Sequence, residues 1–151
     1  MEAFYGEYLD RLGMLHAELA AALRGLPLEG LDWTPAPGTN SLGALAVHVA
    51  GAERYWLGDV VASEPSGRDR DAEFRTRGED AQALLQRLEA ALTYAARVLE
   101  GLRREDLTAV RVSPRDGRGF TVGWCLAHVL GHTGIHAGHA QITRQLWEQR
   151  K

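Results

Sequence analysis

The chain has 151 residues and a net charge of −3 when its histidines are neutral, and this length predicts one domain spanning residues 1–151. Its 45% apolar and 25% charged residues are ordinary for a globular domain that folds without disulfides or a structural metal. The charge gives no basic footprint for nucleic acid, and no run approaches the roughly 18 apolar residues that cross a membrane. Because it has one cysteine and an N-terminus without signal-peptide character, we expect a cytoplasmic protein.

The first part of the chain predicts a long helix followed by a loop. Apolar residues at three- and four-residue spacings predict this helix over residues 3–26. His16 lies within it, beside Glu18, and is expected at the surface. The proline- and glycine-rich stretch that follows, "GLPLEGLDWTPAPGTN", is typical of a loop.

A second helix is predicted to begin near Ser41. Its N-cap candidates are Thr39, Asn40 and Ser41. This helix contains His48 at the border of an apolar stripe. It fades at "SEPSGRDRD", residues 63–71, which we expect to be a solvated linker.

The second half of the chain predicts two more helices joined by a short hairpin. Leucines, alanines and valines at helical spacing predict a third helix over residues 80–102. After it "AVRV" alternates, "PRDG" is a turn signature and "GFTV" can pair back, which indicates a β-hairpin. A fourth helix runs from Thr121, its candidate N-cap, to Glu148. The predicted fold is all-α, a four-helix bundle with a short β-hairpin between helices three and four.

The fourth predicted helix contains "HVLGHTGIHAGHAQI", which includes four of the six histidines in the chain. These four are His128, His132, His136 and His139. At about 100° per residue, they fall within a stripe about 80° wide. The apolar residues that bracket the stripe are Trp124, Val129, Ile135, Ile142 and Leu146. We therefore expect the histidines to face into the bundle.

Buried imidazoles need partners, because an unpaired buried polar group costs roughly 1–3 kcal/mol. His132 and His136 are four residues apart, so that one metal ion can bind a ring nitrogen of each. A third ligand is expected from a facing helix, where His48 is a better candidate than His16. The alternative is that these histidines are hydrogen-bonded core residues. Cys125 lies near the same stripe, and a small buried hydrophobic residue is its favoured interpretation.

The remaining histidines of the stripe are expected beside the ligands. His128 lies one turn earlier, where it could be a third ligand or a hydrogen-bond donor to a ligand. We predict that His128 does not bind the ion itself. His139 is the candidate catalytic acid–base group. Trp33, Tyr55 and Trp56 are candidates, with His128, for the walls of a substrate pocket. Ordinary bundle packing is the alternative for the aromatic residues.

Two stretches resemble the DinB-like superfamily of metal-binding four-helix bundles. "WTPAPGTNSLGALAVHVAGAERYW" is similar to the family's loop and second helix, and "HVLGHTGIHAGHAQITRQL" is similar to its C-terminal motif. The resemblance covers nearly the whole chain and implies His48, His132 and His136 as the ligand triad. Many members read His-Arg-Gly-Gln after the last ligand, whereas this chain reads His136-Ala137-Gly138-His139. That variant resembles a subgroup that often lacks the middle histidine, which is present here as His132.

The resemblance implies a metal-dependent enzyme that transfers a low-molecular-weight thiol to an electrophilic small molecule. Three imidazoles leave open positions on a divalent ion, which is typical of catalytic sites. Zn or Ni is favoured as the ion, and Fe, Mn or Cu would also suit an imidazole site. Family analogy also implies a homodimer. The alternatives are a metal-dependent hydrolase and a non-catalytic metal-binding or stress-related bundle.

Overall fold

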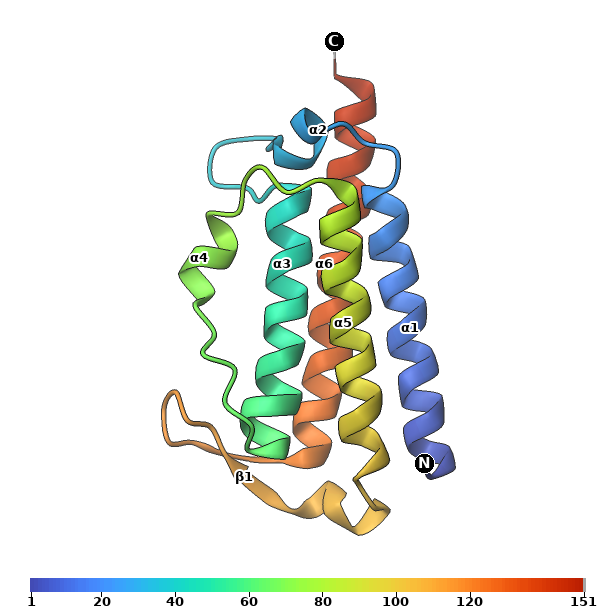
Figure 1. Ribbon diagram of the computed structural model, residues 1–151, viewed down its shortest axis with the longest axis vertical. Coiled ribbons are helices and arrows are strands. Elements are labelled where there is room, and N and C mark those ends of the chain that lie inside the picture. Colours follow the sequence, from blue (N-terminus) through green and yellow to red (C-terminus); the bar gives the residue numbers. More distant parts are fainter. Residues whose placement is uncertain (151) are drawn as a thin grey trace.

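A computed structural model describes residues 1–150 and contains four long helices that lie side by side (Figure 1). These are α1 (Ala3–Leu23), α3 (Leu42–Glu53), α5 (Ala81–Glu100) and α6 (Val122–Gln149). A π-helix, η1 (Arg54–Ala62), follows α3 directly. The shorter helices are α2 (Leu28–Asp32), α4 (Arg70–Phe74) and the 3₁₀-helix η2 (Arg104–Thr108). No helix within residues 1–150 is long and apolar enough to cross a membrane.

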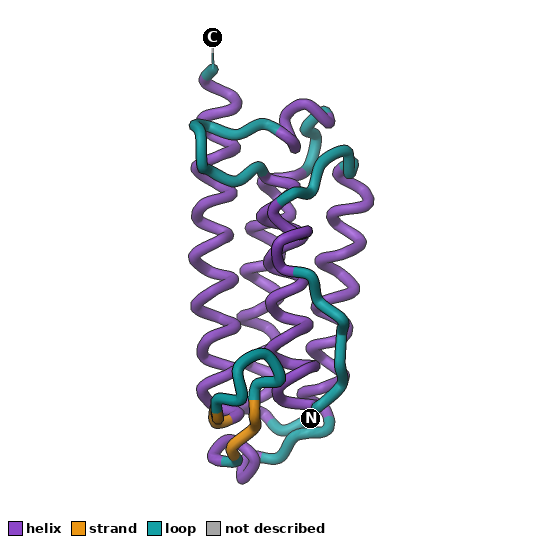
Figure 2. The backbone as a smooth tube through the Cα atoms, turned by 90° about the vertical axis from the view of Figure 1, so that its left-hand side faces the viewer, coloured by secondary structure: helices purple, strands orange, loops and turns teal. Residues whose placement is uncertain are grey.

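A two-stranded hairpin lies at the end of the bundle where α6 begins (Figure 2). Its strands are β1 (Val110–Val112) and β2 (Gly119–Thr121), which pair antiparallel with Arg111 opposite Phe120. Each strand is one residue shorter than the stretch that predicted it, because Ala109 is the C-cap of η2 and Val122 is the first residue of α6. The predicted all-α bundle with a hairpin before its last helix is therefore confirmed.

Side-chain caps mark where α3, α5 and α6 begin, and two of them confirm predicted candidates. The Ser41 hydroxyl accepts a hydrogen bond from the Ala44 backbone N–H at 3.2 Å, so that Ser41 is the cap among the three candidates. The Thr121 hydroxyl does the same for the Trp124 N–H at 3.1 Å, as predicted. Each cap satisfies an N–H that lacks a helical partner and contributes about 1 kcal/mol. The two caps define the register of α3 and α6, which are neighbours in the bundle.

The core consists of two apolar clusters along the bundle axis. The cluster next to the hairpin includes Tyr5, Leu12 and Trp56, and Phe120 of the hairpin packs against it. The cluster at the other end includes fully buried leucines of α1, α3 and α5. Each fully buried leucine or aromatic side chain stabilises the fold by roughly 1.5–3 kcal/mol. This burial explains why the bundle needs no disulfide, and within the described residues the single cysteine is free.

Helix α6 packs into the bundle mainly through small side chains. Its buried residues are Val122, Cys125, Leu126, Val129, Thr133, Ala137, Ala140, Thr143 and Trp147. The expectation of a face bracketed by large apolar residues is wrong for Trp124, Ile135, Ile142 and Leu146, which are 44%, 61%, 56% and 43% exposed. Alanine and threonine allow α6 to lie close to α1 and α3, which the spacing of large residues alone does not reveal. The histidine stripe consequently lies at the border of the buried face.

The stretch between η1 and α5 differs from the expected solvated linker. In Figure 1, α4 lies beside α3, outside the four long helices. The side chains of Arg68 and Glu73 in this segment are only 11% and 7% exposed. Asp69 caps α4 by accepting a hydrogen bond from the Ala72 N–H. The charged composition of residues 63–71 predicted solvation, but Arg68 of this stretch pairs with Glu73, two residues beyond it, against the bundle.

Candidate metal centre

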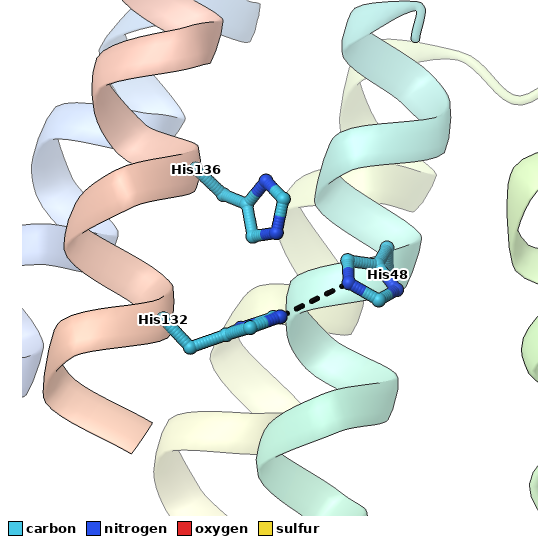
Figure 3. A group of neighbouring side chains, drawn as sticks. All are labelled: His48, His132 and His136. Atoms are coloured by element: carbon cyan, nitrogen blue, oxygen red, sulfur yellow. Dashed lines mark hydrogen bonds between the residues drawn. The ribbon is translucent and has the colours of Figure 1, made fainter. Parts of the chain in front are cut away.

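Three histidines from two facing helices meet between α3 and α6 (Figure 3). His48 comes from α3, while His132 and His136 occupy one face of α6, one turn apart. One ring nitrogen of each lies within 4.8 Å of those of the other two. The closest pair is Nε2 of His48 and Nε2 of His132, which are 3.1 Å apart. The arrangement brings together the three histidines that the sequence suggested as ligands.

The second ring nitrogen of His48 has a carboxylate partner. Nδ1 of His48 lies 2.9 Å from Oε2 of Glu73 in α4. Arg68 donates to both carboxylate oxygens of Glu73, with Nε at 2.6 Å and Nη2 at 2.8 Å. Burial raises the pKa of Glu73, but hydrogen bonds from Arg68 and His48 outweigh it and leave this pKa below its ordinary value. An ionised carboxylate can only accept, so that His48 donates from Nδ1, and in its neutral form Nε2 then carries the lone pair.

His132 and His136 are neutral at physiological pH. Burial, followed by the neighbouring imidazoles of His136 and His48, lowers the pKa of His132 to about 3. Burial and then His48 and His139 lower the pKa of His136 to about 4. Neutral imidazole is the form that binds a metal ion. The donor set therefore fits a divalent ion in composition, spacing and protonation.

Aromatic side chains border the histidines on the side nearer the hairpin. The His128 ring stacks on Trp124, with ring centroids 4.9 Å apart and planes inclined by 10°. Trp56 lies edge-on to His128 at 4.7 Å, and the His132 ring follows at 5.7 Å. Burial lowers the pKa of His128. His128 is thus the neighbour of a candidate ligand and does not belong to the convergent group.

On the other side of the centre, His139 lines a cavity of about 350 Å³. Nδ1 of His139 lies 3.4 Å from Nδ1 of His136. The His139 side chain is exposed, whereas His136 is only partly exposed. The other lining residues are Pro35, Thr39, Asn40, Leu45, Ile142, Thr143 and Leu146. This cavity gives a small molecule an apolar surface one helical turn from His136.

The two other aromatic residues suggested for a substrate pocket have different neighbours. Trp33 packs edge-on against Trp147, with ring centroids 5.8 Å apart. Tyr55 is buried in the cluster near the hairpin, and its hydroxyl shares a 2.8 Å hydrogen bond with Ser113. Bundle packing accounts for the contacts of both residues.

A second buried histidine–glutamate pair lies between the two apolar clusters. Nε2 of His16 lies 2.9 Å from both carboxylate oxygens of Glu53, and the Thr133 hydroxyl donates to Glu53 at 2.7 Å. His16 and Glu53 are 5% and 1% exposed, so that the expectation of a surface His16 is wrong. The position of Glu53 within the apolar stripe of its helix was a signal for this pair. Helix α1 buries His16 because α3 provides the acceptor.

Cys125 lies in the apolar cluster near the hairpin and is fully buried. Burial raises the pKa of its thiol to about 11. The interpretation as a small buried hydrophobic residue agrees with this environment. A thiol with this pKa is a poor nucleophile near neutral pH.

Three solved structures have similar folds. A conserved protein from Enterococcus faecalis has a TM-score of 0.83 at 16% identity, covering 99% of both chains. A DinB-like protein from Bacillus cereus ATCC 10987 has a TM-score of 0.74 at 20% identity, covering 91% of this chain and 89% of the other. YfiT from Bacillus subtilis, described as a "probable metal-dependent hydrolase with an unusual four-helix bundle topology", has a TM-score of 0.75 at 14% identity. That match covers 96% of this chain and 89% of YfiT.

These similarities confirm the DinB-like fold that the two sequence stretches suggested. No curated protein matches the chain. The family model for Mycothiol-S-transferase matches residues 8–149, nearly the whole chain. The protein is therefore an enzyme of the mycothiol S-transferase family.

Proposed function

We propose that this enzyme transfers mycothiol to an electrophilic small molecule at a centre where His48, His132 and His136 bind one divalent ion. The observation that supports the proposal most is the convergence of three imidazoles in a chain of this family. The favoured ions are Zn and Ni; Fe and Cu, which imidazole also binds, and Mn are alternatives. Bound there, the ion would favour deprotonation of a coordinating thiol and act as a Lewis acid.

The protein's own residues would orient the substrates and exclude water. Trp56 and the stacked His128–Trp124 pair provide an aromatic wall beside His132. The cavity beyond His136 provides an apolar surface for the body of the electrophile. His139 lines this cavity and would accept or donate a proton there.

Two further features belong to the same proposal. Ile135 of α6, which is 61% exposed and lines neither the aromatic wall nor the cavity, would be covered in a homodimer. A solution mass equal to one chain across micromolar concentrations would contradict the dimer.

The proposed location is the cytoplasm, which agrees with the one free, buried cysteine of the described residues.

Paired variants test the proposal. His136→Ala should lose tight metal binding and mycothiol transfer to a chromogenic aryl halide, whereas His128→Ala should keep metal binding. Metal content and product mass are the two measurements. Loss of metal from both variants would contradict the proposed ligand set. If the metal-loaded enzyme shows no transfer over a broad electrophile panel, the transfer proposal fails. Metal-dependent cleavage without mycothiol in the product would favour hydrolysis, the activity in the description of YfiT.

A further inference from the structure

We propose that Glu73, oriented by Arg68, is the positioning residue of this centre: it selects the His48 tautomer whose Nε2 lone pair faces α6. The inference rests on the proposed metal site and concerns residues outside the four long helices. Glu73 belongs to α4, 25 residues from His48 in the sequence. Its carboxylate accepts a hydrogen bond from Nδ1 of His48, on the opposite side of the ring from His132.

Arg68 makes the tautomer depend on Glu73. Nη2 of Arg68 lies 3.4 Å from Nδ1 of His48, in addition to its 2.8 Å bond to Glu73. A guanidinium only donates hydrogen bonds, so that without the carboxylate it would favour a bare Nδ1 and a protonated Nε2. That tautomer has no lone pair toward α6. With Glu73 present, the acceptor next to Nδ1 favours the metal-binding tautomer instead.

Gly51 provides the space that the carboxylate occupies. It lies almost one turn after His48 on α3, on the side that faces α4. A Cβ atom at this position would overlap Oε1 and the carboxyl carbon of Glu73 and would approach Nε of Arg68 within 3.4 Å. An alanine there would therefore displace the carboxylate without changing any charge. Gly51 makes the close approach of Glu73 to α3 possible.

The environment of Glu73 explains why two contacts are needed to orient it. An open cavity of about 700 Å³ lies between α3, α5 and the α4 segment, and Arg68 and Glu73 both line it. The carboxylate would have room to rotate toward this cavity if the two hydrogen bonds from Arg68 were absent. Phe74, the next residue, packs against the His48 ring with centroids 4.5 Å apart. Together these contacts orient His48 from the face opposite to α6.

The decisive experiment combines the imidazole ¹⁵N spectrum of His48 in the metal-free protein with a metal affinity titration. In the parent protein, His48 should show the Nδ1–H tautomer. In Glu73→Ala it should shift to the Nε2–H tautomer, and zinc affinity should fall roughly 10–100-fold. Glu79→Ala is the matched control, because Glu79 lines the same cavity and pairs with Arg87 at 2.6 Å. The control should keep both the tautomer and the affinity.

A second pair of variants addresses folding and retains Glu73 itself while moving its carboxylate. Gly51→Ala should weaken zinc binding in the same direction, whereas Gly131→Ala should not, because a Cβ at Gly131 meets nothing within 4 Å. If folded Glu73→Ala retains the Nδ1–H tautomer and the parent affinity, the positioning role is wrong. If the parent itself binds no divalent ion, the proposed metal function fails. The tautomer measurement on metal-free protein still decides the role of Glu73 in that case.

Discussion

The bundle contains two buried histidine–glutamate pairs that are alike in their direct contact and different in their surroundings. His48 and Glu73 are 2.9 Å apart, and so are His16 and Glu53. Both histidines are almost fully buried. The second ring nitrogen of His48 faces His132, whereas Nδ1 of His16 has no hydrogen-bond partner among the described residues. The two pairs therefore differ in the neighbours of the histidine ring nitrogen that does not contact the glutamate.

This difference separates a metal-centre pair from a core pair. Glu73 has an arginine as its second partner and borders an open cavity. Glu53 has the Thr133 hydroxyl instead and lies between two apolar clusters. A histidine–carboxylate contact alone is thus no evidence for a metal site. Three predictions test the distinction, from the largest expected effect to the smallest, and a fourth concerns another buried titratable group.

The first prediction concerns the core pair. Glu53→Ala should lower the free energy of unfolding by about 3 kcal/mol, because it removes the acceptor of two buried donors and leaves a cavity. His16 and Thr133 are those donors. Urea unfolding measures this loss. The folded variant should bind zinc as the parent does; a folded protein without zinc affinity would remove the distinction between the two pairs.

The second prediction compares the two histidines directly. His48→Ala should weaken metal binding by at least about 100-fold, because loss of a ligand should exceed the 10–100-fold effect of losing its carboxylate partner. His16→Ala should lower stability and keep the metal affinity. Competition with a chromophoric chelator measures both affinities. Equal losses in the two variants would mean that His16 also supports the centre.

The third prediction concerns metal removal. A chelator should leave the helical circular dichroism at room temperature intact, because the two apolar clusters supply the core. The melting temperature should fall by about 5–10 °C, which is the loss expected for a ligand at about 100 times its Kd. Loss of helicity on chelation would contradict this and make the metal structural. In the His48→Ala variant, the chelator should not lower the melting temperature further.

The last prediction concerns Cys125, a buried titratable group without a polar side-chain partner among the described residues. Burial raises its pKa to about 11, above the unfolded value, so that the fold favours the neutral thiol. The associated stability is present below the unfolded pKa and is lost as the pH rises toward about 11. Alkylation of the native protein at pH 8 should be slow, and Cys125→Ser should retain activity. Loss of activity in that folded variant would identify the thiol as part of the reaction.

The sequence predicted the fold where local signals and tertiary packing agree. Helical periodicity, the caps Ser41 and Thr121, and the turn signature of the hairpin all depend on neighbouring residues. The spacing of His132 and His136 places both on one helix face in any fold that keeps this helix. The convergence of His132 and His136 with His48 was predicted from the place of His48 on a facing helix and from the family resemblance.

Local sequence by itself determined the four long helices, the hairpin and the histidine pair of α6, because each depends on residues within a few turns. Only the tertiary structure decided which face of α6 is buried and that His16 lies in the core. It also showed that Arg68 of the expected linker and Glu73 of α4 pack beside His48. These features depend on pairs such as Glu53 and Thr133, which are 80 residues apart, and His48 and Glu73, which are 25 apart. A buried charge is tolerated only where partners satisfy it, and for Glu53 these partners come from distant segments. Neither local propensity nor periodicity predicts such contacts.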